Sequence, residues 1–364
     1  MAMSFEEYIN AYYGGVLGIS KRYGIRKDTL ETSDTGYFNA MYGAAVFNQL
    51  NTKSEIFKLL PKEGWTQSGW RVLTARGTTT AGRAEGATLG TTDVPDITEV
   101  TATIKEVVTP WDVTTRAEFL AEADDGVKGL AAFLRREQAE AHAYYIDQML
   151  VASAETVTAA NLESLDRVAL SDAAAAATLS ARGDADIYDI TRETSSWSDA
   201  TVSHASGSDR ALTLAMMDTL IQGALENGAN YDDLIWLTGH DSLQDIKALI
   251  NTSSNATWRF DLGPMGQGSM NGVSAERGMN LDSRVGYYDS IPIFVSQHIV
   301  KDGASHVYLL DMAHLKMKLA APTTYVSSED LAVTQKLAKD FAYITAGEII
   351  CTKFITQGSI RDLS

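Results

Sequence analysis

Three aspartates occur within the six residues 184–189. Asp184, Asp186 and Asp189 could offer carboxylate oxygens to a divalent cation, because hard cations prefer oxygen ligands. The segment lacks the glycine and the distal glutamate of a calcium-binding loop. We therefore interpret it as an acidic turn exposed to water, and we keep a cation site as the alternative.

Other patterns that could support catalysis are incomplete. Residues 266–270 (GQGSM) do not form a nucleophile elbow, and residues 82–86 (GRAEG) lack the Lys-Ser/Thr of a phosphate-binding loop. The histidines show no metal-ligand spacing with one another or with Cys351. They stand at positions 142, 204, 240, 298, 306 and 314. The sequence predicts neither an enzyme nor a cofactor site.

The segment from Trp65 to Asp112 predicts a long two-stranded excursion rich in Thr, Gly and Val. Its alternating pattern indicates an outbound strand over 70–76 and a returning strand over 98–107, with a tip at 77–96. An isolated hairpin is only marginally stable in water. We therefore expect the excursion to lie on another copy of the chain, which favours a building block over a catalyst.

The composition excludes several classes of protein. Of the 364 residues, 45% are hydrophobic and one is cysteine, so neither wholesale disorder nor a disulfide framework is expected. The formal charge of −17 is unlike that of a sequence-reading nucleic-acid binder, which carries a basic face. No apolar run reaches the length of a membrane span, and residues 1–7 do not resemble a signal peptide. We expect a soluble intracellular protein.

Helices are predicted on both sides of the excursion. Residues 1–62 read as an N-terminal arm that docks through aromatic side chains at helical spacing. These aromatic residues are Phe5, Tyr8, Tyr12 and Tyr13. Beyond the excursion, Thr114 or Thr115 is expected to cap a helix over about Arg116 to Ala152, which would be roughly 50 Å long.

The rest of the chain alternates between helices and strands. The segment from Ala154 to Asp209, with an Ala-rich helix near 171–181 and then a Ser/Thr/Asp-rich stretch, is interpreted as a surface insertion. Asp209 is expected to cap a helix through Glu226, which Asn227-Gly228 closes. The further elements are a strand at 234–238, a helix from Asp241 to Ile250, a Gly/Met/Asn-rich loop at 251–282, and strands at 290–295, 306–311, 315–319 and 341–354.

The order of these elements resembles that of the major capsid proteins of tailed double-stranded-DNA viruses, the Hong Kong 97 phage type. The resemblance covers most of the chain from about Trp65 onward. The segments that carry it are 83–87 with 93–96 for the extended loop, 107–119 for the entry to the long helix, 234–249 for a strand, break and helix, 290–295 for a return strand, and 347–354 for the closing strand. Ser290 stands where the family usually has glycine.

The resemblance implies an α+β fold with an N-terminal arm, an extended β-hairpin loop, a long spine helix in a peripheral domain, and an axial α/β domain. The implied division is an N-terminal arm at 1–62, the extended loop at 63–106, the peripheral domain at 107–155, an insertion or connector at 156–209, the axial domain at 210–325, and return strands to the peripheral domain at 326–364.

The resemblance also implies a function. The chain would be a structural shell subunit that self-assembles into an icosahedral head around double-stranded DNA, located in the virion capsid after assembly in the host cytoplasm. Its partners would be further copies in hexamers and pentamers, separate scaffold, portal and decoration proteins, and packaged DNA through weak non-specific contact, with no membrane. The residues expected at contacts between subunits are Phe5, Tyr8, Tyr12, Tyr13, Trp70, Arg76, Arg83, Glu85, Asp93, Asp96, Trp258, Met265 and Met270.

Two features depart from particular members of the family. No lysine lies between Lys62 and Lys105, so isopeptide cross-linking through the extended loop is not expected. Some members of the family carry a fused N-terminal scaffold that is later cleaved. Residues 1–62 are instead expected to be ordered and retained, so any scaffold is expected to be a separate chain.

Three alternatives remain open from the sequence. An encapsulin-type compartment shares the fold and encloses cargo enzymes. An α/β enzyme could use residues 251–282 as a lid, but no convergent set of polar groups supports it. A tail-tube protein would be rich in strands and would not include a helix of the predicted length.

Overall fold

The computed structural model describes residues 55–77, 85, 94–122, 130–252, 260–261, 284–299, 307–327 and 338–364. The described chain divides into two compact units. The first unit holds described residues within 107–145 and 321–345, and the second holds those within 55–106, 146–320 and 346–364. The two units are described separately below.

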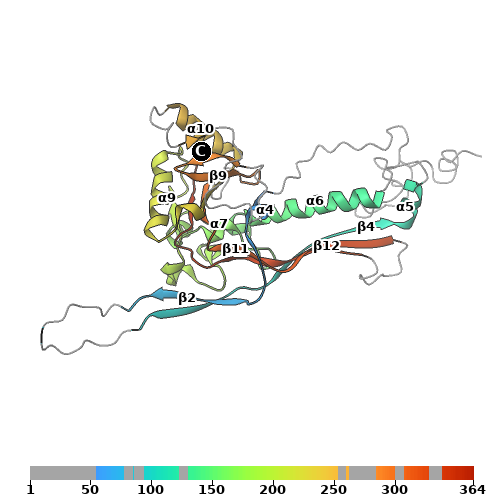
Figure 1. Ribbon diagram of the computed structural model, residues 1–364, viewed down its shortest axis with the longest axis horizontal. Helices are drawn as coiled ribbons and strands as arrows, with labels where there is room; N and C mark the ends of the chain where they lie inside the picture. Colours follow the sequence, from blue (N-terminus) through green and yellow to red (C-terminus); the bar gives the residue numbers. More distant parts are fainter. Residues whose placement is uncertain are drawn as a thin grey trace, which may run out of the picture. The chain divides into compact units, whose positions relative to one another are not determined.

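Most helices lie in the second unit, and their course is drawn in Figure 1. The α-helices are α4 (Ile56–Leu59), α5 (Thr115–Glu122), α6 (Leu130–Leu150), α7 (Leu165–Val168), α8 (Asp172–Thr178), α9 (Leu214–Glu226) and α10 (His240–Thr252). Short 3-10 turns are η2 (Ala154–Thr156), η3 (Arg182–Ala185), η4 (Arg192–Thr194), η5 (Ser196–Ser198) and η6 (Tyr231–Asp233). None of the helices in the described ranges is long and apolar enough to cross a membrane.

The strands form three sheets. They are β1 (Lys62–Gly64), β2 (Gly69–Ala75), β3 (Asp96–Thr101), β4 (Lys105–Thr114), β5 (Thr201–Ser203), β6 (Leu234–Thr238), β7 (Phe260–Asp261), β8 (Arg284–Tyr288), β9 (Ile291–Val295), β10 (Val307–Asp311), β11 (Leu315–Val326), β12 (Ala338–Cys351) and β13 (Gly358–Ile360). The sheet orders are β1-β11-β12-β4, β5-β13-β10-β6-β9-β8-β7, and β2-β3.

The seven-stranded sheet supplies the core of the second unit. Every residue of β6, β9 and β10 is buried, as expected for continuous apolar runs that are covered on both faces. On one face the sheet packs against α9 and α10. This cluster includes Leu220, Ile221, Trp236, Ile246, Ile293 and Leu309. On the opposite face, the hydroxyl of Ser359 donates a 2.6 Å hydrogen bond to the carbonyl of Ala169, so the segment before α8 covers that face.

Helix α9 ends where the sequence predicts and begins later. Gly228 adopts a positive φ of 81°, the left-handed conformation that terminates helices. Thr213, rather than the predicted Asp209, caps the first turn with its side chain. The earlier start was wrong because the backbone N–H of Arg210 donates to the carbonyl of Asp362 at 2.9 Å. That pairing holds Arg210 beside the C-terminal residues and outside the helix.

The prediction of a surface insertion over 154–209 is also wrong, because much of this segment is core. Leu162, Leu165 and Val168 have no exposed surface. Arg192 is buried with them and donates hydrogen bonds to several backbone carbonyls, including that of Ala185 at 2.8 Å. Burial lowers the pKa of Arg192 to about 10, which still leaves the side chain charged at neutral pH.

In the first unit, the predicted long helix corresponds to α5 and α6, and residues 123–129 lie outside the described part of the chain. Thr114 caps α5 as predicted, since its hydroxyl accepts the N–H of Ala117 at 3.2 Å. The core of this unit joins α5, α6 and the adjacent strands. Its members include Val113, Ala117, Leu130 and Leu134, and Trp111 stacks on Phe341 with ring centroids 4.4 Å apart.

A hydrogen-bonded chain crosses the interior of the first unit through His142. The Nδ1 atom of His142 lies 2.8 Å from the hydroxyl of Thr109, and Nε2 lies 2.8 Å from that of Thr345. The hydroxyl of Thr345 in turn lies 2.8 Å from that of Thr323. This arrangement ties α6 to β4 and β12, and burial lowers the pKa of His142.

Acid is expected to destabilise the protein through His142. A lowered pKa in the folded state means that the unfolded state binds the proton more tightly, so stability is lost as pH falls below about 6.5 and through the folded pKa. Urea midpoints measured from pH 7.5 to pH 5 should fall less steeply in His142→Gln than in the wild type. The exposed His240→Gln serves as the control, and an unchanged profile in His142→Gln would contradict the assignment.

Gly347 is expected to tolerate no side chain. A Cβ at this buried position of β12 would overlap the carbonyl oxygen of Lys318 on the neighbouring strand. Gly347→Ala should therefore lower the free energy of unfolding by about 1–3 kcal/mol, as overpacking does elsewhere. Gly64→Ala, in β1 of the same sheet, meets no atom within 4 Å and should leave the urea midpoint nearly unchanged.

Candidate functional site

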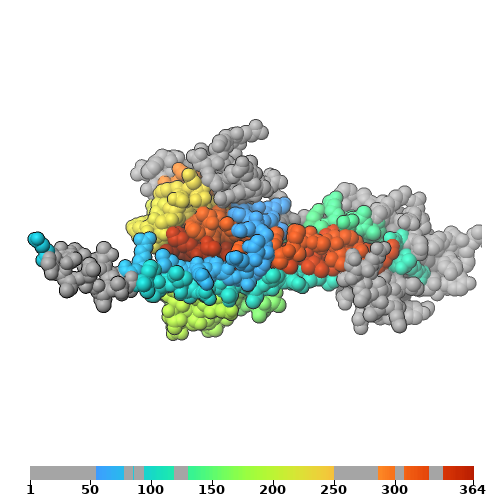
Figure 2. Space-filling view, turned by 60° about the horizontal axis from the view of Figure 1, so that its bottom comes forward, coloured from blue at the N-terminus to red at the C-terminus, as the bar shows by residue number. Residues whose placement is uncertain are grey.

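The strands β2 and β3 of the predicted excursion pair in antiparallel orientation. We call this hairpin the arm; it is distinct from the N-terminal arm predicted at 1–62. Its two strands run side by side in Figure 1, and their blue and cyan atoms lie next to one another in Figure 2. The predicted returning strand over 98–107 is interrupted, because β3 ends at Thr101 and the chain then enters β4. Since β4 pairs with β12 in a different sheet, residues 102–105 form the point where the arm meets the rest of the second unit. We call these residues the root.

The two faces of the arm differ. Trp70 points inward and meets the ring of Tyr188 edge-on, with centroids 5.3 Å apart. On the opposite face Leu73 lies across from Ile97, and these side chains are 55% and 62% exposed. An exposed ion pair of 3.1 Å joins Arg71 to Glu99 on that outward face. Alternation along the strands thus leaves one face of the arm on the body and the other uncovered by this chain's described residues.

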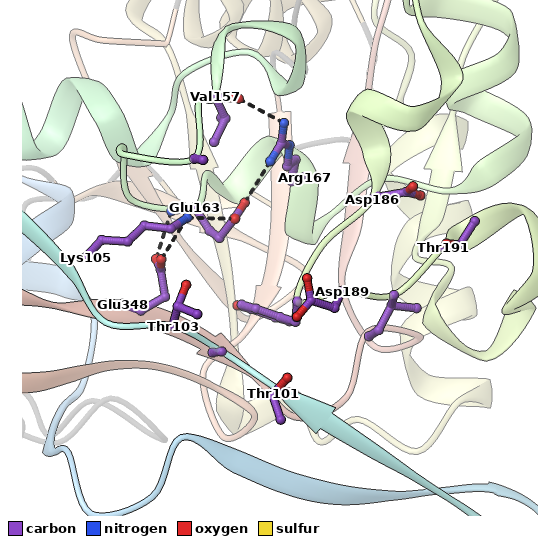
Figure 3. A pocket seen from close by; sticks show the side chains of 14 residues that line it. Thr101, Thr103, Lys105, Val157, Glu163, Arg167, Asp186, Asp189, Thr191 and Glu348 are labelled. Carbon is purple, nitrogen blue, oxygen red and sulfur yellow. Dashed lines mark hydrogen bonds and ion pairs between the residues drawn. The ribbon is translucent and has the colours of Figure 1, made fainter.

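At the root, Lys105 meets two carboxylates that come from distant parts of the chain (Figure 3). Its ammonium lies 2.9 Å from Oε1 of Glu163 and 3.1 Å from Oε2 of Glu348. Burial alone would lower the pKa of Lys105, but the neighbouring Glu348 and Glu163 outweigh it and the pKa is raised. The lysine is therefore firmly charged, and we call the three residues the root cluster.

Glu348 is the most deeply buried member of the root cluster, with 1% of its surface exposed. Its Oε1 accepts the backbone N–H of Glu163 at 2.8 Å and that of Ile349 at 2.9 Å. Burial raises the pKa of Glu348 to about 7, although the positive charge of Lys105 opposes the rise. The carboxyl group can therefore gain or lose a proton near neutral pH.

Arg167 supports the other side of Glu163. Its guanidinium lies 3.2 Å from Oε2 of Glu163 and also donates to the carbonyls of Val157 and Asp184, at 3.0 and 2.7 Å. These groups border a hollow of about 550 Å³, which is large enough to admit water to the root cluster. The hollow is lined by charged and hydroxyl side chains, including Thr101, Thr103 and Asp189 (Figure 3).

The structure locates some of the residues predicted from the sequence. Arg76, Glu85 and Asp96 are exposed, whereas Trp70 contacts Tyr188 of its own chain. The remaining residues expected at subunit contacts lie outside the described ranges. They are Phe5, Tyr8, Tyr12, Tyr13, Arg83, Asp93, Trp258, Met265 and Met270.

The three aspartates at 184–189 do not assemble a cation site. Within the part of the chain that the structure describes, no group of three or more His, Cys, Asp or Glu residues could hold a metal ion. The carboxylate of Asp186 instead accepts the backbone N–H of Arg192 at 3.0 Å. These aspartates therefore belong to the turns that lead into η4.

Sequence reasoning missed the root cluster. Lys105, Glu163 and Glu348 are far apart in the chain, so no local spacing reveals them. One signal was available, since Glu348 is an acid within the apolar closing segment and a charge in such a strand needs a partner.

Removing the lysine of the root cluster should be costly. Lys105→Met would leave Glu163 and Glu348 buried without their shared cation, so we expect the free energy of unfolding to fall by about 3–5 kcal/mol. Lys316 pairs with Glu63 at 3.2 Å on the surface, and Lys316→Met should cost less than about 1 kcal/mol. Urea unfolding of both variants at pH 8 tests the difference, and equal losses would show that the root cluster is not a buried network.

No protein-family model and no curated protein matches the sequence. Solved structures do match it. A chain of the cyanophage A-1(L) capsid asymmetric unit superposes with a TM-score of 0.65 at 16% identity, covering 88% of this chain and 95% of that chain. A capsid chain of the native GTA particle gives 0.56 at 11% identity, with 88% and 93% covered. A chain of Microbacterium phage Oxtober96 gives 0.52 at 11% identity, with 87% and 93% covered.

These similarities extend over nearly the whole length of each chain, so they concern the entire arrangement of elements rather than one motif. At such low sequence identity they establish the fold. The chain has the α+β fold of tailed-phage capsid proteins, the Hong Kong 97 type that its order of elements predicts.

Proposed function

We propose that this chain is a shell subunit, the major capsid protein of a tailed double-stranded-DNA virus. The arm carries the proposal, because its outward face presents apolar side chains in a fold that capsid proteins share. Leu73 and Ile97 lie on that face, Val94 just before β3 is 75% exposed, and Ile104 at the root is 45% exposed. A hairpin that turns such residues to water gains stability when a partner covers it.

The partner that fits is another copy of the chain. In a shell, each subunit lays its arm on a neighbour and receives the arm of another, so one interface repeats around the particle. Among the described residues the arm is a sheet of two strands, and the edges of such a sheet can add backbone hydrogen bonds to the apolar contact. Many modest contacts of this kind would close hexamers and pentamers into an icosahedral head.

The charge of the chain bears on its contact with DNA. The chain has a formal charge of −17, so it offers little positive charge to the phosphates of packaged DNA. The contact that we propose is therefore weak and independent of sequence. Scaffold, portal and decoration proteins would be separate chains. The subunit would assemble in the host cytoplasm and remain in the virion capsid.

Electron microscopy of the purified recombinant chain tests the proposal directly. Negative-stain images, with size-exclusion chromatography, should show closed shells or hexameric and pentameric rings. A monomer or dimer that persists at high concentration and with a scaffold protein would contradict it. The contents of particles isolated from the source separate a virus from an enzyme-filled compartment, because the first contain DNA and the second contain protein cargo.

The outward face of the arm should be essential for assembly and dispensable for folding. Leu73→Asp with Ile97→Asp places charges where the isolated subunit faces water, so we expect the urea midpoint to change little and shells to be lost. The control, Leu73→Ile with Ile97→Leu, keeps the face apolar and should assemble normally. Normal shells from the double aspartate variant would exclude this face from the subunit contacts.

A further inference from the structure

The three side chains of the root cluster meet in a geometry that suits the formation of an amide (Figure 3). Lys105 lies in β4 and Glu348 in β12, which are neighbouring strands of one sheet. The ammonium of Lys105 lies 3.1 Å from Oε2 of Glu348 and 2.9 Å from Oε1 of Glu163. Groups oriented in this way within one molecule can react as if at an effective concentration of about 10⁵–10⁸ M.

We propose that the root cluster forms an intramolecular isopeptide bond between Nζ of Lys105 and Cδ of Glu348, with Glu163 as the base. The bond ties β4 to β12 next to the point where the arm departs. It joins two strands of one chain and links no subunits to each other, so it goes beyond the proposed function and does not depend on it.

The two oxygens of Glu348 have different surroundings, and each suits one part of the reaction. Oε1 accepts the backbone N–H of Glu163 at 2.8 Å and that of Ile349 at 2.9 Å. Two N–H donors at such distances form an oxyanion hole, which stabilises the negative charge that develops on Oε1 when an amine attacks Cδ. Oε2 receives no backbone N–H from the described residues and faces the lysine, so it is the oxygen that leaves.

The reaction balances without any further reactant. The ammonium of Lys105 passes one proton to Oε2 of Glu348, which leaves an amine beside a neutral carboxyl group. As the amine attacks Cδ, its second proton moves to the carboxylate of Glu163, which Arg167 holds at 3.2 Å. The Nζ–Cδ bond forms, the Cδ–Oε2 bond breaks, and Glu163 returns the second proton to Oε2, which departs as water. The hollow beside the cluster gives this water a path to solvent.

Burial favours the linked state. An enclosed ammonium and carboxylate lose their hydration, and their attraction repays that loss only in part. The amide carries no charge, and its carbonyl oxygen, the former Oε1, keeps the two backbone donors. Burial raises the pKa of Glu348 to about 7, which eases the first proton transfer. The raised pKa of Lys105 keeps the amine rare, so the reaction is slow, but each chain needs it only once.

Intact-mass spectrometry of the denatured full chain tests the proposal. After prolonged incubation of the folded, unassembled subunit at neutral pH, the wild type should be lighter than its sequence by the mass of one water. Protease digestion should then yield a branched peptide that joins Lys105 to Glu348. The full sequence mass would overturn the proposal, and so would a water loss that maps elsewhere, as in an aspartyl succinimide.

Variants of the cluster test the role of each group. Lys105→Arg keeps the positive charge without an amine and should retain its full mass. Glu348→Gln should lose the mass of ammonia instead of water, because nitrogen takes the place of the leaving oxygen, and a purely structural role produces no such change. Glu163→Gln should form the link about a hundredfold more slowly, since its neutral amide cannot accept the proton. An unchanged rate would exclude Glu163 as the base.

A matched surface pair supplies the control. Lys316 lies 3.2 Å from Glu63 on the surface, and Lys316→Arg should lose water as the wild type does. The mass of the wild type decides the proposal even if a variant of the cluster fails to fold. A chain without the link that still builds shells would refute this inference alone, so its failure is distinct from that of the proposed function.

Discussion

Buried charges that bind the backbone hold the second unit together. Apart from β5, residues 152–213 contain only short helices and turns, so many of their carbonyl and N–H groups depend on side chains for partners. Arg192 donates hydrogen bonds to carbonyl groups. Asp166 accepts a hydrogen bond from the N–H of Ala154 at 2.9 Å and forms an ion pair with the buried Arg361 at 2.7 Å. Each charge is fully enclosed, so the loss of one partner would leave the other without water or a counter-ion. Polar contacts therefore hold this segment in place together with its apolar core.

In the root cluster, too, buried charges bind the backbone, but the burial of its acid Glu348 is compensated less fully. Arg192 and Asp166 meet several partners each, whereas Glu348 has a pKa raised to about 7 because burial outweighs the effect of Lys105. A buried acid with a raised pKa thus lies close to the point where the arm departs. The apolar outward face of the arm lies beyond that point.

The sequence predicted what local patterns determine. Thr114 as a helix cap, Gly228 as a helix end and the buried strand at 234–238 follow from neighbouring residues, and the order of elements identified the capsid fold. Contacts between distant residues decided the failures. The bond from Arg210 to Asp362 delayed the start of α9, and a change of partner strand divided the predicted strand over 98–107. The root cluster was missed for the same reason, since Lys105 and Glu348 come together through the shared sheet of β4 and β12.

The position of β13 has a consequence for how the chain is made. This strand, residues 358–360, lies between β5 and β10 in the seven-stranded sheet, and it pairs with both. A ribosome that has translated only as far as residue 350 has therefore produced β5 and β10 without the strand that joins them. The nascent polypeptide cannot complete this sheet until residues 358–360 have emerged from the ribosome, so the sheet closes late in synthesis relative to its other strands.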